Sequence, residues 1–255
     1  MLLYISRQND FYMNLIVDVG NSLVKIAVFQ RYKHLKTFWA SLEEFPKKFQ
    51  EIKKEYPEIR FSILASVVKD TFHIEKVLKN ETQLFVLDEK IDLPFTNKYA
   101  TPNTLGKDRI ALVAAGAKQF KENNLLVIDA GTCITFDFKN DQNEYLGGAI
   151  SPGIEMRFKA LHNFTDNLPF VEFVGEAHLI GDSTHSSILS GVVNGVVAEI
   201  DGLVDRYKTE NKYLTVILTG GNAQFLLKRV KNSIFANPNF LLEGLNYILE
   251  SNKTQ

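Results

Sequence analysis

This sequence contains little cysteine and carries almost no net charge, and each of these features argues against a class of protein. The 255 residues include one cysteine, Cys133, which cannot form a disulfide within the chain and fits a reducing compartment. Lysine and arginine number 29 against 30 acidic residues, so the net charge of −1 gives no polyelectrolyte signature. General binding to nucleic acid or to an anionic membrane surface is therefore disfavoured.

Long apolar runs and regularly spaced metal ligands are also missing. No run of apolar residues reaches the length of a membrane span. The five histidines are scattered and show no metal-ligand spacing with Cys133, which argues against zinc. Residues 1–12 lack the apolar segment of a signal peptide, and Met13 directly precedes the first predicted strand. We therefore expect a soluble cytoplasmic protein in which residues 1–12 are an N-terminal extension.

A short motif near the start is the most informative feature that is present. Residues 15–29 form an apolar stretch, a polar turn and a second alternating stretch, which predicts a β-hairpin. The Asn21 amide, the Ser22 hydroxyl and the Lys25 ammonium are suitable donors for a polyphosphate. Asp18 beside them could hold a divalent cation. The alternative is an ordinary hairpin whose turn is polar.

The hairpin pattern occurs a second time about half a chain later. In residues 125–138, Asp129 matches Asp18 and Gly131 matches Gly20. Such a repeat predicts two similar subdomains. Glycine at the turn leaves room for a ligand to approach the backbone. Two strand ends of this kind, facing one another, would form a cleft for phosphate and cation.

The order of the predicted elements indicates an α/β fold. After the first hairpin come a strand, a helix, a strand, a helix and a strand, at residues 35–40, 41–56, 61–68, 71–79 and 84–87. That order is typical of a ribonuclease-H-like domain. The second half starts similarly, and further helices are predicted at 107–120, 184–207 and 240–250. We predict duplicated ribonuclease-H-like domains at residues 13–121 and 122–255, with the active site in the cleft between them.

Two further groups of residues could carry chemistry. Asp108 stands in the first turn of a predicted helix, where the helix dipole keeps a carboxylate ionised and able to accept a proton. Arg109 offers a fork for a carboxylate or phosphate, although a capping aspartate beside a surface arginine is the simpler alternative. The stretches 147–153 and 219–221 are predicted strand ends that open into helices. Their glycine turns could face phosphate or sugar, or could be plain strand-to-helix turns.

Together and in this order, these motifs resemble type III pantothenate kinases, members of the actin/Hsp70/sugar-kinase superfamily. The resemblance covers residues 13–250 and is carried by residues 18–25, 106–109, 129–132, 147–148, 152–153 and 219–221. It implies transfer of the ATP γ-phosphate to the primary hydroxyl of pantothenate. The product is 4'-phosphopantothenate, and the reaction is the first step of coenzyme A synthesis.

The resemblance also assigns roles to individual residues. The residues implied to bind ATP are Asp18, Val19, Gly20, Asn21, Ser22, Leu23, Val24, Lys25, Thr132, Gly220 and Gly221. Asp18 would lie near Mg²⁺, Asp129 would bind the monovalent cation (K⁺ or NH₄⁺), and Asp108 would accept the proton. The residues implied to bind pantothenate are Tyr99, Gly106, Lys107, Asp108, Arg109 and Thr184, of which Thr184 by itself would be a helix cap. A homodimer is implied, with the long second-half helix near its interface.

Three other functions compete with this one. The same family includes relatives described as transcriptional accessory proteins, against which the intact Asp108 and Asp129 argue. A ribonuclease-H-like nuclease could use Asp18, Asp129 and Asp137 around two metals, but the near-neutral charge disfavours it. An actin-like or Hsp70-like ATPase would need a longer chain with insertions.

Overall fold

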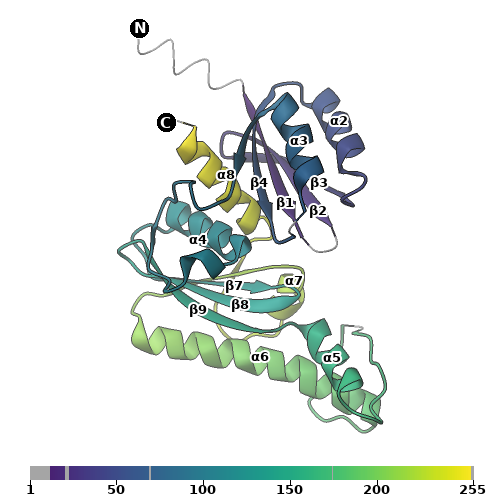
Figure 1. Cartoon of the computed structure of the whole chain (residues 1–255). Helices are drawn as coiled ribbons and strands as arrows, with labels where there is room; N and C mark the ends of the chain where they lie inside the picture. The colour runs from purple at the N-terminus through teal and green to yellow at the C-terminus, as the bar shows by residue number, and fades with distance from the viewer. Residues whose placement is uncertain (1–11, 21–22, 69, 174, 254–255) are drawn as a thin grey trace. The chain divides into compact units, whose positions relative to one another are not determined.

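The computed structural model describes residues 12–20, 23–68, 70–173 and 175–253 (Figure 1). The chain divides into two compact units, which we describe separately. Unit 1 comprises residues 1–119 together with 240–255, and unit 2 comprises residues 120–239. The predicted N-terminal extension lies outside the described residues, apart from Tyr12.

Unit 1 contains a five-stranded sheet in the order β3-β2-β1-β4-β5. Its strands are β1 (Met13–Val19), β2 (Val24–Gln30), β3 (Lys33–Ala40), β4 (Ile59–Ser66) and β5 (Gln83–Val86). The first three strands pair antiparallel, and β4 and β5 continue the sheet in parallel. This is the ribonuclease-H-like order that the sequence predicts.

Two helices cover one face of this sheet, and both form because their apolar residues recur at helical spacing. Helix α2 (Phe45–Glu55) buries Phe45, Phe49 and Ile52, and α3 (Phe72–Glu81) buries Ile74 and Leu78. The predicted start of α2 at Ser41 is too early. The Ser41 and Glu44 side chains instead bond each other's backbone N–H groups in the turn that precedes the helix.

The last two helices of unit 1 pack against each other. Helix α4 (Lys107–Gln119) is buried on almost every side from Ala111 to Ala117, so its buried surface is wider than the single apolar stripe that the sequence predicts. Helix α8 (Phe240–Asn252) lies against it, and a Cβ on Gly244 would overlap the carbonyl oxygen of Ala111. The remaining short elements are β6 (Thr96–Asn97) and a 3₁₀ turn, η2 (Pro102–Thr104).

The placement of α8 differs from the predicted domain limits, which assign all of residues 122–255 to the second half. Its polar side chains tie it to unit 1: Nδ2 of Asn14 on β1 donates to Asn246 and to Glu250, each at 2.6 Å. Since α4 is apolar around its circumference, a second helix is needed to cover it, and α8 supplies that cover.

Unit 2 repeats the strand order of unit 1. Its strands are β7 (Leu125–Ala130), β8 (Cys133–Lys139), β9 (Glu144–Pro152), β10 (Thr215–Thr219) and β11 (Phe235–Ala236). They are arranged β11-β10-β7-β8-β9, with β7, β8 and β9 antiparallel and β10 and β11 parallel to β7. The duplication inferred from the two hairpins therefore extends to the whole sheet.

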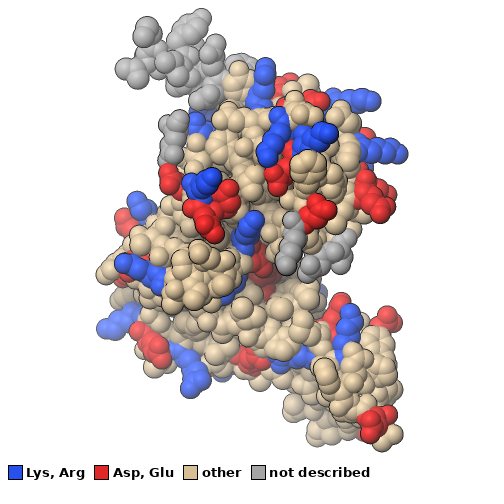
Figure 2. Space-filling view, viewed as in Figure 1, with Lys and Arg blue, Asp and Glu red and all other residues tan. Residues whose placement is uncertain are grey.

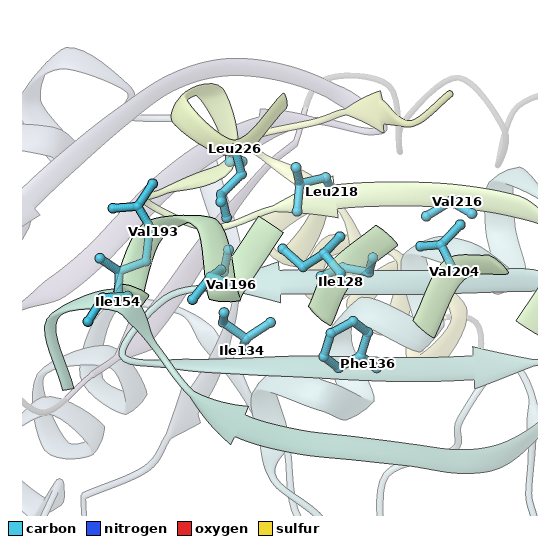
Figure 3. Close-up of a cluster of buried hydrophobic side chains, with 14 of the residues drawn as sticks. Ile128, Ile134, Phe136, Ile154, Val193, Val196, Val204, Val216, Leu218 and Leu226 are labelled. Atoms are coloured by element: carbon cyan, nitrogen blue, oxygen red, sulfur yellow. The ribbon is translucent and has the colours of Figure 1, made fainter. Parts of the chain in front are cut away.

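One face of this second sheet carries helices α5 (Ile154–Asn163), α6 (Thr184–Glu210) and α7 (Ala223–Leu227). Figure 3 shows the core between them, where Ile128, Phe136 and Leu218 of the sheet meet Val196 and Val204 of α6. Helix α6 is also long and apolar enough to cross a membrane, but half of its most apolar window is buried, as expected of a core helix.

Candidate functional site

The β1–β2 hairpin holds the first predicted group of site residues. Asp18 is the penultimate residue of β1 and pairs in register with Lys25 on β2. The turn closes with the Gly20 amide donating to the carbonyl of Leu23 at 3.0 Å. Asn21 and Ser22, predicted to bind ATP, lie outside the described residues. The hairpin thus sets a carboxylate and an ammonium side by side on one face of the sheet.

Asp18 is electrostatically perturbed. Burial and the negative charge of Asp108 raise the pKa of the Asp18 carboxyl to about 6, and the Lys25 ammonium opposes that rise. Two carboxylates that repel each other in a partly desolvated place are typical of active sites and of cation sites. The structure therefore brings together two residues that are 90 positions apart in the sequence and that sequence analysis assigned to one reaction.

The start of α4 fixes Asp108 and Arg109. A Cβ on Gly106 would overlap Oδ1 of Asp108, so a side chain at position 106 would displace that carboxylate. Oδ1 of Asp108 accepts a hydrogen bond from the Arg109 amide at 2.8 Å. The Arg109 side chain is only 4% exposed, and its guanidinium lies 5.6 Å from the centre of the Tyr99 ring. Arg109 therefore links Tyr99, through its guanidinium, to Asp108, through its backbone amide.

Lys107 points elsewhere. It lines a cavity of about 690 Å³ with Ile110 and the loop that follows β5, and neither Asp108 nor Arg109 reaches this cavity. The structure thus gives no support from geometry for grouping Lys107 with its two neighbours.

The β7–β8 hairpin of unit 2 holds the matching group. Asp129 is the penultimate residue of β7 and pairs with Thr135 on β8, as Asp18 pairs with Lys25. Its turn is one residue tighter, because the Gly131 amide donates to the carbonyl of Cys133 at 2.9 Å. Thr132 is exposed at the tip of this turn.

Two glycine turns pack against this hairpin. Gly220, with φ of +92°, passes so close to Asp129 that a Cβ would overlap its Oδ1, whereas a Cβ on Gly221 would meet open space. The Gly153 amide donates to the carbonyl of Thr132 at 3.0 Å. The predicted motifs around 129–132, 152–153 and 219–221 therefore converge on one end of the second sheet.

Gly147 and Gly148 lie inside β9, and a Cβ on Gly148 would overlap the carbonyl of Phe136 on the paired strand. The interpretation of Thr184 as a helix cap is wrong. The cap of α6 is Ser183, which exchanges hydrogen bonds with Ser186 in a capping box. Thr184, the first helical residue, is exposed and lines a groove of about 850 Å³ between α5 and α6.

Metal ligands are sparse in the part of the chain that the structure describes. It contains no group of three or more histidine, cysteine, aspartate or glutamate side chains that could hold a metal ion. Among the residues that sequence analysis left without a role, Trp39 is notable because it pairs with Lys25 and is 58% exposed.

Comparison with known proteins identifies the family. The family model described as type III pantothenate kinase matches residues 14–206. The type III pantothenate kinase of Christiangramia forsetii is 54% identical over 95% of this chain and all of its own length. That of Flavobacterium johnsoniae is 48% identical over 92% of this chain and 96% of its own. The chain belongs to the type III pantothenate kinase family. It is therefore an ATP-dependent kinase of coenzyme A biosynthesis.

Solved structures agree on the fold of this pantothenate kinase family member. A Baf family protein from Campylobacter jejuni superposes with a TM-score of 0.62 at 22% identity, covering 94% of this chain and 100% of its own. A ROK family transcriptional regulator gives a TM-score of 0.53 at 9% identity, covering 98% and 83%. At these identities the likeness establishes the fold alone, which is the actin-like ATPase fold.

The family membership also sets aside the nuclease alternative. Asp137, its third predicted metal ligand, is fully buried and accepts hydrogen bonds from Tyr145 Oη at 2.7 Å and Thr135 Oγ1 at 3.1 Å. Basic and acidic side chains are interspersed on the face of unit 1 that Figure 2 shows.

Proposed function

We propose that unit 1 holds both the phosphates of ATP and the reacting end of pantothenate. The observation that supports this proposal is the influence of Asp108 on Asp18: burial and the negative charge of Asp108 together raise the pKa of the Asp18 carboxyl. In the proposed arrangement, residues 18–25 bind the ATP phosphates, with Lys25 as the cation among them and Asp18 near Mg²⁺. Asp108 accepts the proton of the attacking hydroxyl.

The chemistry needs only a weak base at Asp108. Phosphoryl transfer passes through a loose transition state, so the alignment of donor and acceptor and the neutralisation of charge matter more than the strength of the base. The Arg109 amide already holds Oδ1 of Asp108, which fixes the direction of the carboxylate. Bound Mg²⁺ would neutralise charge on the phosphates.

We assign pantothenate to the cluster beside Asp108. Arg109, held against the Tyr99 ring, can pair with a substrate carboxylate. Gly106 leaves room for the Asp108 carboxylate beside it and remains a predicted pantothenate contact from the family resemblance. Lys107 and Thr184 remain predicted contacts from the family resemblance. Lys107 lines a cavity whose lining does not include Asp108 or Arg109, and Thr184 lines the groove between α5 and α6 of unit 2.

In unit 2 we propose that Thr132, Gly220 and Gly221 contact ATP and that Asp129 binds a monovalent cation, K⁺ or NH₄⁺. The proposed cation suits these residues because Asp129 offers carboxylate oxygens as ligands, and the backbone of Gly220 lies directly against that carboxylate. Hard cations take oxygen ligands of this kind. The cation would add positive charge beside the proposed ATP contacts of unit 2.

We also propose a homodimer that forms through α6. Its exposed face carries small residues at helical spacing, Gly191, Gly195, Ala198 and Gly202, and Cβ atoms on the three glycines would meet open space. Small residues let a second helix approach closely. Gly195→Arg should therefore convert a dimer to a monomer in light scattering.

A cytoplasmic location, without nucleic-acid or membrane partners, remains a prediction from composition.

A coupled ADP-release assay with ATP and Mg²⁺ tests the proposed activity. We expect turnover that requires pantothenate and that is faster in K⁺ than in Na⁺ at equal ionic strength. Turnover that is equal in the two salts would contradict the proposed cation site. An absence of turnover from the folded protein would favour the non-catalytic relatives of the family.

A further inference from the structure

Strand β8 carries a polar face that is buried instead of exposed. Its residues alternate between apolar and polar types, as in a strand with one face in water. The apolar residues pack against α6, yet on the opposite face Thr135 is only 8% exposed and Asp137 is 0% exposed. Burying a carboxylate is costly unless its oxygens are satisfied, so this face calls for an explanation.

The hydrogen bonds on this face have a defined direction. Tyr145 Oη donates to Oδ1 of Asp137 at 2.7 Å, and Thr135 Oγ1 donates to Oδ2 at 3.1 Å. A threonine hydroxyl has one hydrogen and two lone pairs. Because Asp137 accepts that hydrogen, the Thr135 oxygen can only accept a hydrogen bond or bind a cation on its other side.

The register of the sheet puts this oxygen beside Asp129. Thr135 is the direct antiparallel partner of Asp129, so the two side chains lie on the same face with Cβ atoms about 4.5–5.5 Å apart. An ammonium ion needs acceptors and a potassium ion needs oxygen ligands, and a threonine oxygen whose hydrogen is already used serves both.

We propose that Thr135 supplies a second oxygen ligand to the monovalent cation at Asp129, and that Asp137 with Tyr145 positions it. This inference rests on the proposed cation site. It adds three residues to that site: one ligand, Thr135, and two residues that act through it. It also explains why a buried strand face retains a carboxylate and two hydroxyl groups.

The test measures K⁺ binding to the ligand-free protein by thermal shift, with KCl replacing NaCl at constant ionic strength. Thr135→Val removes the oxygen while keeping the shape, and Thr135→Ser is the matched control that keeps the hydroxyl. We expect the half-saturating K⁺ concentration to rise about tenfold or more in Thr135→Val and to stay close to the wild-type value in Thr135→Ser. For each protein, the K⁺ concentration that gives half-maximal turnover should match the half-saturating K⁺ concentration from the thermal shift.

Asp137→Asn provides a second, independent variant. The asparagine can donate as well as accept, so the Thr135 hydroxyl is no longer fixed and K⁺ binding should weaken. A wild-type half-saturating concentration in Thr135→Val, or in Asp137→Asn if Thr135→Val does not fold, would overturn the inference.

The variant Asp129→Asn distinguishes a failure of the proposed cation site from a failure of the role of Thr135. If it leaves a K⁺-specific shift intact, the cation site itself is wrong. If it abolishes the shift while the Thr135 and Asp137 variants keep it, only the role of Thr135 is wrong.

Discussion

Among single residues, Asp108 has the most specific proposed role, that of proton acceptor. Asp108→Asn keeps the size of the side chain and its ability to accept from the Arg109 amide, but removes the proton acceptor. We expect kcat to fall by about 100- to 10,000-fold, the usual contribution of a positioned general base. ATP binding should be nearly unchanged. Trp39, the chain's one tryptophan, pairs with Lys25, so its fluorescence can report nucleotide binding in the same samples. Wild-type turnover in this variant would contradict the assigned role.

Asp18 should make the stability of the protein depend on pH. Its pKa is raised from an ordinary value of 3.8 to about 6 by burial and by Asp108, so ionisation disfavours the folded state. The contribution of this group to the free energy of unfolding is complete below about pH 4, falls as pH rises towards 6 and is then constant.

The variant Asp18→Asn removes the decrease in the free energy of unfolding that ionisation of Asp18 causes. Relative to wild type, it should be about equally stable near pH 4 and more stable above pH 6, by at most about 3 kcal/mol for a shift of about two pKa units. Urea denaturation of the protein without nucleotide or Mg²⁺, at pH 4 and at pH 7.5, measures this difference. A stability difference that is the same at both pH values would contradict the pKa assignment.

At the scale of elements, the turn after β10 offers a matched pair of glycines. Gly220→Ala forces a side chain into a positive φ and against Asp129, so we expect a destabilisation of about 1–3 kcal/mol. Gly221→Ala adds a methyl group in open space and should change the free energy of unfolding by less than about 0.5 kcal/mol. Equal effects in the two variants would show that the turn does not pack against Asp129 as described.

Most elements could be predicted because their signals are local. The β1–β2 hairpin, the repeated Asp-x-Gly turn and the apolar face of α2 each follow from residues within one element. The electrostatic influence of Asp108 on Asp18 could be anticipated only from the family resemblance, because no rule of sequence spacing relates the two residues. The buried polar face of β8 could not be predicted, since its alternation is the pattern of a strand exposed to water.

At the scale of the whole molecule, the chain crosses between the two units twice, at residues 119–120 and 239–240. The second crossing was not predicted, because an amphipathic C-terminal helix carries no signal for which unit it covers. Gly244→Ala tests this assignment, since its Cβ would overlap backbone atoms of α4 that cannot move aside cheaply. We expect about 1–3 kcal/mol of destabilisation in urea denaturation, and an unchanged stability would contradict the packing of α8 on α4.

The central claim is that this chain phosphorylates pantothenate with Asp108 as the proton acceptor. Its most direct test is ³¹P NMR of the product formed from ATP, Mg²⁺ and pantothenate, with wild type and Asp108→Asn compared in parallel. We expect one equivalent of phosphate on the primary hydroxyl of pantothenate for each ADP released by wild type, and at least about 100-fold less product from the variant over the same time. ADP release without phosphorylated pantothenate, or equal product from both proteins, would contradict it.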